Sequence, residues 1–357
     1  MRAIQMVRSE ARGVAYGEDI EVPTPGPGEV RVRVARTAIC GTDRHIYHWD
    51  DSISHLVQPP VTIGHEFCGY IDELGDGVEG WYEGDYVSAE MHIVCGTCRA
   101  CLRGDFHICE NTKIAGLQQN GSFAESVVIP ASNLVRLDPD IVPPHIGAFL
   151  DALGNAVHTI QSSAGIEGRH ILLSGYGAIG AMAAAVVQFR GAASLTISEV
   201  SPGHLKRARE WAARMGGEVP IHILNPIEEP DFAGRIRDLT GGGVDSVLEM
   251  SGAVPAINAG LDALYPGGEI VLLGIPSGRN LEIERFSERV IFKGLTLKGV
   301  VGRRMFETWD EMLELLRLGL DLEHIVTHQM PLSSFEDGIQ LLDRGEAHKV
   351  VLDPSAV

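Results

Sequence analysis

The sequence predicts an α/β protein in which a β-rich domain is interrupted by a doubly wound domain built on a parallel sheet. Three observations lead to this prediction. Near the start, short apolar runs such as VRVRVA (30–35) are separated by glycine and proline, as in antiparallel domains. From about residue 153, strand-like and helix-like segments alternate, which is the pattern of βαβ units. After about residue 297 this alternation stops, so we expect the chain to return to the first domain.

The elements follow in order from their local patterns. The first domain is expected at 1–152 and 297–357, and the second at 153–296. The alternating strands and helices of the second domain are predicted in HILLSG, AIGAMAAAVVQFRGA, SLTISEV, LKRAREWAARMGG, VPIHIL, FAGRIRDLTGG, VDSVLEMSG and GGEIVLLGIP. Beyond it, the sequence predicts a helix in ETWDEMLELLRLG (307–319) and a closing strand in KVVLD (349–353).

Composition limits the functional classes. The chain has 357 residues, 45% of them apolar and 22% charged, which suits two ordinary globular domains. Its net charge of -19 argues against binding to nucleic acid, whose phosphates would repel an acidic surface. Only five of the 29 basic residues are lysine, which fits either adaptation to salt or an arginine-rich composition in an ordinary acidic enzyme. No run of about 18 apolar residues and no apolar leader is present, so we expect no membrane span and a cytoplasmic location.

Four of the six cysteines lie within CGTCRACLRGDFHIC (95–109), at the spacing C-x2-C-x2-C-x7-C. They are Cys95, Cys98, Cys101 and Cys109. Disulfides are one interpretation, but disulfide frameworks are typical of short secreted chains. Cysteines two residues apart favour a metal, because the short loop lets thiolates converge on a tetrahedral ion. We therefore predict a structural zinc ion, and four thiolates would leave no position open for a substrate.

The motif GYGAIG (175–180) follows an apolar strand and opens an alanine-rich helix, as in dinucleotide-binding domains. Gly175 permits the tight turn, Gly177 lets a pyrophosphate approach the backbone, and Gly180 lets helix and strand pack closely. We expect cofactor contacts at these glycines and at Ile179. Glu199 ends the next strand, where a carboxylate accepts hydrogen bonds from the adenosine ribose and disfavours a 2'-phosphate, so NAD is favoured over NADP. The alternative is a structural turn with a solvated glutamate.

Four further residues precede this motif. Cys40 lies in ICGTDRH (39–45), His65 and Glu66 lie in IGHEFCG (63–69), and Asp151 lies in LDALGNAVH (150–158). A lone residue of any of these types is more often structural than a ligand. However, Cys40 is outside the four-cysteine loop and available for another use, and the His65-Glu66 pair lies between glycines that suit a bend presenting both side chains.

Taken in order, the motifs Cys40-Gly-Thr-Asp and Gly64-His65-Glu66, the four-cysteine loop and Gly-x-Gly-x-x-Gly resemble those of the zinc-dependent medium-chain alcohol dehydrogenases. The resemblance covers nearly the whole chain. It implies a GroES-like catalytic domain with a zinc lobe at about 90–112, and a Rossmann domain that binds NAD. Longer matches resemble bacterial members that oxidise L-threonine, and they are CGTDRHIYHWD (40–50), EMHIVCGTC (90–98), LGNAVHT (153–159), LEMSGA (248–253), VIFKGL (290–295) and GRRMFETW (302–309).

The resemblance also implies metal ligands. It makes Cys40, His65 and Glu66 ligands of a catalytic zinc ion, with Asp151 as a candidate fourth group. The chain departs from the family pattern here, because Asp151 is shorter than the glutamate of some members and Ala152 stands where we expect proline. Two zinc ions per chain are therefore expected, one catalytic and one structural.

The remaining roles implied by the resemblance concern the reaction. An open zinc position would bind the hydroxyl oxygen of L-threonine, Thr42 and His45 would relay its proton to solvent, and a hydride would move to NAD. The product would be 2-amino-3-oxobutyrate. His92 would help to admit the amino-acid substrate, and the assembly would be a homotetramer.

Two alternatives remain open at this point. One is a related zinc-dependent dehydrogenase that acts on a polyol or another secondary alcohol, such as sorbitol or 2,3-butanediol. The other is a redox-inactive zinc protein that binds NAD as a sensor, against which the presence of Cys40, His65, Glu66 and Thr42 argues.

Overall fold

The structure, a computed structural model, describes residues 1–217, 219–276 and 280–356. The chain forms two compact units. The first unit comprises Met1–Ala152, Arg304–Gly319 and Val326–Val357, and the second comprises Leu153–Arg303 and Leu320–Ile325. The chain returns to the first unit later than the residue 297 expected from the sequence, because strand β16 (Thr296–Gly299) is the edge strand of the sheet in the second unit.

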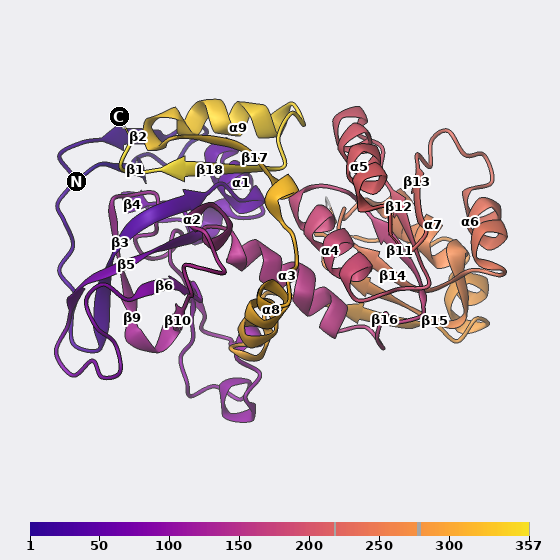
Figure 1. Ribbon diagram of the computed structural model, residues 1–357, viewed down its shortest axis with the longest axis horizontal. Coiled ribbons are helices and arrows are strands. Elements are labelled where there is room, and N and C mark those ends of the chain that lie inside the picture. Colours follow the sequence, from indigo (N-terminus) through magenta and orange to yellow (C-terminus); the bar gives the residue numbers. More distant parts are fainter. Residues whose placement is uncertain (218, 277–279, 357) are drawn as a thin grey trace. The chain divides into compact units, whose positions relative to one another are not determined.

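The first unit is rich in β-structure (Figure 1). Its largest sheet has the strand order β10-β6-β5-β3-β18-β17, and β9 pairs with β3. These strands are β3 (Glu29–Ala38), β5 (Phe67–Leu74), β6 (Tyr86–Ala89), β9 (Ser126–Pro130), β10 (Leu134–Arg136), β17 (Val326–Pro331) and β18 (Lys349–Asp353). The smaller sheets contain β1 (Ala3–Met6), β2 (Val14–Gly17) and β4 (Val61–Thr62), and separately β7 (His92–Ile93) and β8 (Lys113–Ile114). The helices are α1 (Gly41–His48), α2 (Pro144–Gly147), α8 (Glu307–Arg317) and α9 (Phe335–Asp343), while α3 (Leu150–Gln161) runs on into the second unit.

Strand register in the first unit brings distant parts of the chain together. In the antiparallel pair of β3 and β5, Thr37 lies opposite Phe67. The end of β3, which leads to Cys40, is therefore next to the start of β5, which follows His65 and Glu66. Strand β18 pairs with the same end of β3, with Val351 opposite Ala38. Lys349, the first residue of β18, therefore lies near this end of β3 as well.

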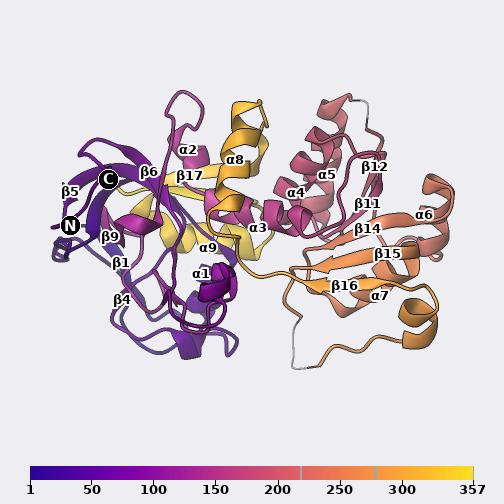
Figure 2. The ribbon, with the colours of Figure 1, turned by 90° about the horizontal axis from the view of Figure 1, so that it is seen from below.

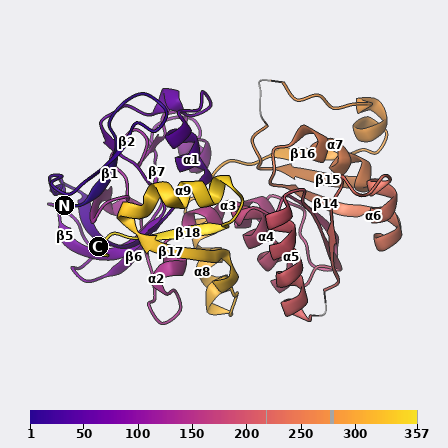
Figure 3. The same cartoon turned by 90° about the horizontal axis from the view of Figure 1, so that it is seen from above.

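The second unit is built on a parallel sheet with the strand order β13-β12-β11-β14-β15-β16. Its strands are β11 (His170–Ser174), β12 (Ser194–Ser198), β13 (Ile221–Leu224), β14 (Val244–Glu249), β15 (Leu264–Leu272) and β16, and its helices are α4 (Ala178–Phe189), α5 (Pro202–Met215), α6 (Phe232–Thr240) and α7 (Val254–Ala263). The order reverses between β11 and β14, and right-handed crossovers therefore place α4 and α5 on one face and α6 and α7 on the other (Figures 2 and 3). This arrangement confirms the predicted doubly wound domain.

Each unit has its own hydrophobic core. In the first unit, one cluster gathers around Ile39, Phe123 and Phe335 and another gathers around Val32 and Phe67. In the second, the central strands pack against α6 and α7 through apolar side chains that include Val247, Ile257 and Leu261. Among the residues that the structure describes, no helix has both the length and the apolar composition that crossing a membrane requires.

Candidate active site and metal centres

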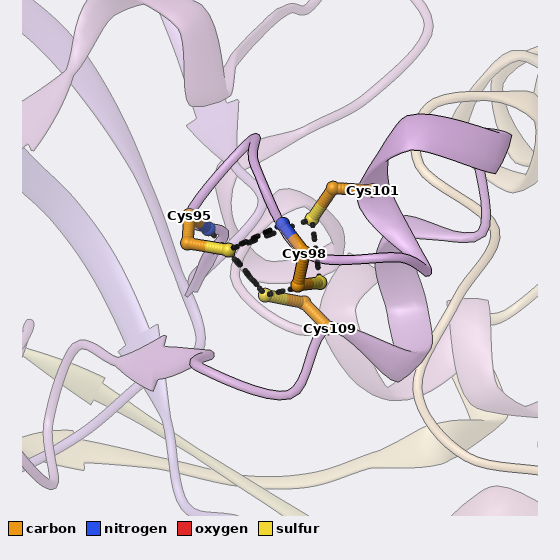
Figure 4. Close-up of side chains that lie close together, drawn as sticks. All are labelled: Cys95, Cys98, Cys101 and Cys109. Atoms are coloured by element: carbon orange, nitrogen blue, oxygen red, sulfur yellow. Dashed lines mark hydrogen bonds between the residues drawn. The ribbon is translucent and has the colours of Figure 1, made fainter.

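The four cysteines of the 95–109 loop converge, as Figure 4 shows. Their sulfur atoms are separated by 3.5 Å for Cys98 and Cys101, 3.6 Å for Cys95 and Cys109, 3.9 Å for Cys98 and Cys109, and 4.0 Å for Cys95 and Cys101. A tetrahedral zinc ion with Zn–S bonds of about 2.3 Å holds its sulfur ligands about 3.8 Å apart. The cluster therefore has the dimensions of a zinc site with four thiolate ligands. None of the six cysteines forms a disulfide.

Hydrogen bonds within the loop favour the thiolate form of Cys95, whereas burial raises the pKa of Cys101 to about 12. The backbone N–H groups of Cys98 and Asn111 donate to the sulfur atoms of Cys95 and Cys109, each at 3.4 Å. Backbone hydrogen bonds from Thr97 and Cys98 lower the pKa of Cys95 to about 5. Because a thiolate, not a thiol, is the ligand for zinc, these contacts suit metal binding.

A second group of potential metal ligands consists of Cys40, His65 and Glu66, whose ligand atoms all lie within 4.8 Å of one another. Cys40 is the residue that precedes α1, and the other two lie just before β5. Gly64 has a φ of +90°, and a Cβ atom at this position would lie 2.3 Å from the ring of Phe123. Only glycine therefore permits the bend that presents His65 and Glu66. One thiolate, one imidazole and one carboxylate form a donor set that fits zinc and leaves a position open.

Asp43 contacts two members of this group, Cys40 and His65. Its Oδ2 atom accepts a hydrogen bond from the backbone N–H of Cys40 at 2.8 Å, and its Oδ1 atom lies 3.6 Å from Nδ1 of His65. Burial raises the pKa of Asp43 to about 6, against the opposing effect of His65. Burial alone would lower the pKa of His65, but Asp43 and Cys40 raise it to about 10. Anionic groups therefore converge on His65, an electrostatic environment that suits a divalent cation.

Glu66 forms a buried ion pair with Lys349, the first residue of β18. The Lys349 ammonium lies 2.7 and 2.9 Å from the two carboxylate oxygens of Glu66, and it also donates to the carbonyl of Ile39 at 3.2 Å. Glu66 is 0% exposed and Lys349 is 2% exposed. Burial lowers the pKa of Lys349, but Glu66, Cys40 and Asp43 together more than offset this effect, so the pKa is raised. The carboxylate thus lies close both to the potential metal ligands Cys40 and His65 and to a lysine.

The other residues predicted for the reaction lie around this group in different settings. The Thr42 hydroxyl lies 4.0 Å from the sulfur of Cys40. His45 is farther along α1, with an exposed side chain whose Nδ1 lies 3.3 Å from a carboxylate oxygen of Asp50. Asp151 is buried near the start of α3 and acts electrostatically on His65, but it is not a member of the three-residue group.

His92 lies at the start of β7, shortly before the four-cysteine loop. Its side chain is 23% exposed, and its Nδ1 atom lies 2.7 Å from Oε1 of Glu90, which is fully buried. The imidazole is therefore held by a carboxylate rather than left mobile on the surface.

In the second unit, the glycine motif forms the turn between β11 and α4. Gly175 has a φ of +94°, which favours glycine. A Cβ atom on Gly180 would lie 2.1 Å from the carbonyl oxygen of Gly175, whereas a Cβ atom on Gly177 would meet nothing within 4 Å. Gly177 caps α4, and Ile179 lies in its first turn. The open space at Gly177 and the exposed N–H groups of the helix start form a cradle that fits a pyrophosphate.

Glu199 follows β12 beside this turn. Its carboxylate accepts hydrogen bonds from the backbone N–H groups of Tyr176 at 2.7 Å, Val200 at 2.7 Å and Ser201 at 2.8 Å. Burial would raise the pKa of Glu199, but these bonds and His204 lower it to about 2, so the group is anionic. A cavity of about 620 Å³ opens at the carboxyl ends of neighbouring strands, and its lining includes Ser198, Val200, Ile227, Phe232, Ala253 and Pro255. Its size and apolar lining fit an adenosine group.

Comparison with known proteins extends these observations over the whole chain. Residues 26–139 match the alcohol dehydrogenase GroES-like domain, and residues 178–317 match the zinc-binding dehydrogenase domain. An L-threonine 3-dehydrogenase of Xanthomonas euvesicatoria pv. vesicatoria is 42% identical over 348 residues, which are 97% of this chain and 98% of the relative. The chain belongs to the zinc-dependent medium-chain alcohol dehydrogenase family.

Solved structures agree with this family. The 2R,3R-butanediol dehydrogenase of Bacillus subtilis has a TM-score of 0.87 and 27% identity, with 99% of each chain covered. An alcohol dehydrogenase of Thermus sp. ATN1 has a TM-score of 0.85 and 31% identity, again with 99% of each chain covered. As a zinc-dependent alcohol dehydrogenase, the protein uses zinc and a nicotinamide cofactor.

Three residues of this zinc-dependent alcohol dehydrogenase were not identified from the sequence. Asp43 was visible in the Cys40-Gly-Thr-Asp motif, whose acidic residue three positions after the cysteine is a signal of helix capping. Lys349 gave a weaker signal, a charged residue at the start of the apolar strand KVVLD. Glu90 lies two residues before His92 in the sequence, but its burial and its contacts become evident only in the folded chain.

Proposed function

We propose that this chain oxidises the secondary hydroxyl group of L-threonine to give 2-amino-3-oxobutyrate, and that it acts in threonine degradation. The observation that carries the proposal is its 42% identity to an L-threonine 3-dehydrogenase over 97% of the chain, against 27% identity to the butanediol dehydrogenase. The group of Cys40, His65 and Glu66 supports it, because a three-donor site suits the oxidation of an alcohol.

We also propose that the chain binds two zinc ions with different roles. The four-cysteine cluster holds one, and Cys40, His65 and Glu66 hold the other, with Asp151 as the candidate fourth group. When bound at the second site, zinc acts as a Lewis acid that favours the deprotonated form of a substrate hydroxyl. The Asp43 carboxylate lies 3.6 Å from Nδ1 of His65 and interacts with it electrostatically.

The substrate proton requires a path to solvent, for which Thr42 and His45 are suited. A hydroxyl can accept one proton and donate another, so Thr42 can pass the proton on without a net change of charge. His45 is exposed and can release the proton to water. A carboxylate oxygen of Asp50 lies 3.3 Å from Nδ1 of His45 and can accept a hydrogen bond from it.

The proposed cofactor is NAD. An anionic carboxylate at Glu199 can accept hydrogen bonds from ribose hydroxyls and repels a 2'-phosphate. The backbone N–H groups that hold Glu199 fix this negative charge beside the glycine turn.

A second candidate function is the oxidation of a polyol or another secondary alcohol, which is favoured by the TM-score of 0.87 to the butanediol dehydrogenase. NADH production from L-threonine, sorbitol and 2,3-butanediol decides between the two. We expect kcat/KM to be highest with L-threonine and activity to be lost in the Cys40→Ser variant. A preference for either of the other alcohols would refute the threonine proposal, and no turnover of any of them would favour a sensor.

Two further proposals concern assembly and compartment. Strand β16 is an edge strand, its residues are exposed, and Phe292 and Val301 near it are 80% and 55% exposed. Exposed sheet edges and apolar patches are typical of contacts between chains, so we propose a homotetramer in which this edge is buried. Light scattering after gel filtration tests the mass of the assembly.

We propose that the chain is located in the cytoplasm, because six cysteines without a disulfide suit a reducing compartment.

A further inference from the structure

Three aromatic rings connect the glycine turn of the second unit to a segment far along the chain. Tyr176 lies inside the turn and is 0% exposed. Its ring centre is 6.1 Å from that of Trp211 on α5, a residue that is 1% exposed. The imidazole of His324 stacks on the same indole, with ring centres 5.9 Å apart and ring planes at 25°.

His324 lies in the segment Leu320–Ile325, which belongs to the second unit although the chain before and after it belongs to the first. The segment contains the 3-10 helix η6 (Glu323–Ile325), which contacts α4. Its three apolar side chains are buried. Apolar burial therefore docks this segment on the second unit and holds the imidazole against Trp211.

Polar atoms on two of the rings are buried and have no hydrogen-bond partner among the described residues. They are Nε1 of Trp211 and both ring nitrogens of His324. Burying a polar group without a hydrogen bond is unfavourable, and native structures contain few such groups. Apolar rings at these two positions would fill the space without that cost, so stability alone does not account for a tryptophan and a histidine here.

The turn that packs against these rings also holds the carboxylate assigned to the cofactor ribose. The backbone N–H of Tyr176 donates to Oε2 of Glu199 at 2.7 Å. Because this N–H and the buried ring belong to one residue, a shift of the ring moves the donor as well. Trp211 is therefore connected to Glu199 through Tyr176.

We propose that Trp211 and His324 are positioning residues of the dinucleotide site. Their stacked rings hold Tyr176, and the N–H of Tyr176 in turn fixes the Glu199 carboxylate for recognition of the cofactor ribose. This inference rests on the proposed function, which includes NAD binding at Glu199. The histidine also makes the arrangement sensitive to acid, because protonation favours a solvated imidazole over a buried one.

The direction of this sensitivity follows from the surroundings of His324. Burial lowers the pKa of His324 to about 4, Asp321 in its own segment opposes this effect, and Arg214 on α5 adds to it. Helix α4, which the segment also contacts, has no charged residue. A solvated histidine titrates near pH 6.5, so the docked segment loses stability, and the site should lose affinity, as the pH falls from 6.5 towards 4.

Calorimetric binding of ADP-ribose and of 2'-phospho-ADP-ribose tests the role of Trp211. For Trp211→Leu we expect the affinity for ADP-ribose to fall by about 3- to 10-fold, and the ratio of the two affinities to fall with it. Trp211→Phe keeps an aromatic ring and should bind both ligands nearly as the wild type does. The matched control is Ile236→Ala on α6, which removes a buried side chain of the same unit and should lower stability without changing either affinity.

A double-mutant cycle distinguishes positioning from a general loss of structure. If Trp211 acts through Glu199, Trp211→Leu should cost little further affinity when Glu199→Gln is already present. For His324, the affinity of the wild type for ADP-ribose should fall by at least about threefold between about pH 7.5 and about pH 5. His324→Phe keeps a ring but does not titrate, so its affinity should change less over this range.

Additive losses in the cycle, or an unchanged affinity for ADP-ribose in Trp211→Leu, would overturn the inference. The same pH dependence in the wild type and in His324→Phe would also overturn it, and this comparison decides alone if Trp211→Leu does not fold. The proposed cofactor fails separately. If the wild type binds both ligands equally well, Glu199 does not select NAD, whereas the cycle with ADP-ribose still reports whether Trp211 acts through Glu199.

Discussion

Removal of one thiol from the four-cysteine cluster should separate the structural role of this loop from the rest of the fold. In Cys98→Ser, the sulfur that lies 3.5 Å from Cys101 and 3.9 Å from Cys109 is replaced by a weaker oxygen ligand. The loop has little apolar burial to compensate, since Leu102 is 77% exposed and Ile108 is 50% exposed. Metal binding is therefore the main source of order between Cys95 and Cys109.

The magnitude can be bounded from the chemistry of the cluster. Zinc binding to structural sites in zinc-finger peptides contributes on the order of 10–16 kcal/mol at neutral pH. If the substitution removes only about 2.7 kcal/mol of local stability, the open form of the loop becomes about 100-fold more populated. Cleavage by a protease follows that population when opening is fast. Arg99 and Arg103 are exposed trypsin sites within the loop, so the rate of trypsin cleavage at these residues reports how often the loop opens.

Two measurements check this prediction. Metal analysis should give two zinc ions per chain for the wild type and one for Cys98→Ser, and trypsin should cut at Arg99 and Arg103 at least about 100-fold faster in the variant. Cys68→Ser is the matched control, because Cys68 is buried, belongs to neither group of potential metal ligands, and has contacts with Tyr86 and Pro144 that suit a hydroxyl. Equal trypsin rates for Cys98→Ser and the wild type, or one zinc ion in a fully loaded wild type, would refute the reasoning.

Three further predictions concern other sites. Lys349→Met should lower the free energy of unfolding by about 3–5 kcal/mol, because Glu66 is then buried without its lysine. The double variant with Glu66→Leu should recover most of that loss. Urea unfolding with the site of Cys40, His65 and Glu66 kept free of zinc in every variant measures both, and a loss below about 1 kcal/mol contradicts the prediction. Glu199→Gln should raise KM for NAD and lower the ratio of kcat/KM with NAD to kcat/KM with NADP by about tenfold or more. If steady-state kinetics show that this ratio is unchanged, Glu199 does not recognise the ribose. Burial lowers the pKa of His324 to about 4, so its imidazole, stacked on Trp211, is neutral in the folded chain above this pH. The unfolded chain binds a proton at this histidine below about pH 6.5, so the free energy of unfolding should fall by up to about 3 kcal/mol as the pH falls from 6.5 towards 4. His324→Phe should keep the ring stack and make the melting temperature less dependent on pH in this range. If the melting temperatures of the variant and the wild type depend on pH in the same way, His324 does not have this role.

Local patterns were sufficient for much of the fold. Alternation of apolar strands and helices predicted β11 to β15 with α4, α5 and α6, and the spacing of four cysteines predicted their convergence, because these depend on neighbours in sequence. Helix α7 was missed, since the glycine at position 260 inside its sequence VPAINAGLDA weakens a helical pattern. Strand β16 was not predicted, and the expected boundary at residue 297 falls inside it, because its four residues carry no long apolar run.

The candidate metal site shows where local reasoning ends. Cys40, His65 and Glu66 were identified through the family resemblance, since nothing in the spacing between them indicates that β3 and β5 pair. Lys349 is 283 residues from Glu66, and Trp309 is 219 residues from Glu90. Such contacts are determined by the order of strands in a sheet and by the return of the chain after the second unit, which periodicity does not encode.

The place of β18 between β3 and β17 has a consequence for biosynthesis. This strand completes the largest sheet of the first unit, yet a ribosome makes it only after Leu153–Arg303. At about 5–20 residues per second, that intervening segment takes roughly 8–30 s to synthesise. During this interval, the nascent first unit has an open edge on β3 and a Glu66 carboxylate without the lysine that neutralises it. The second unit can therefore fold during translation, whereas the first completes its metal site only once the C-terminal strand has left the ribosome.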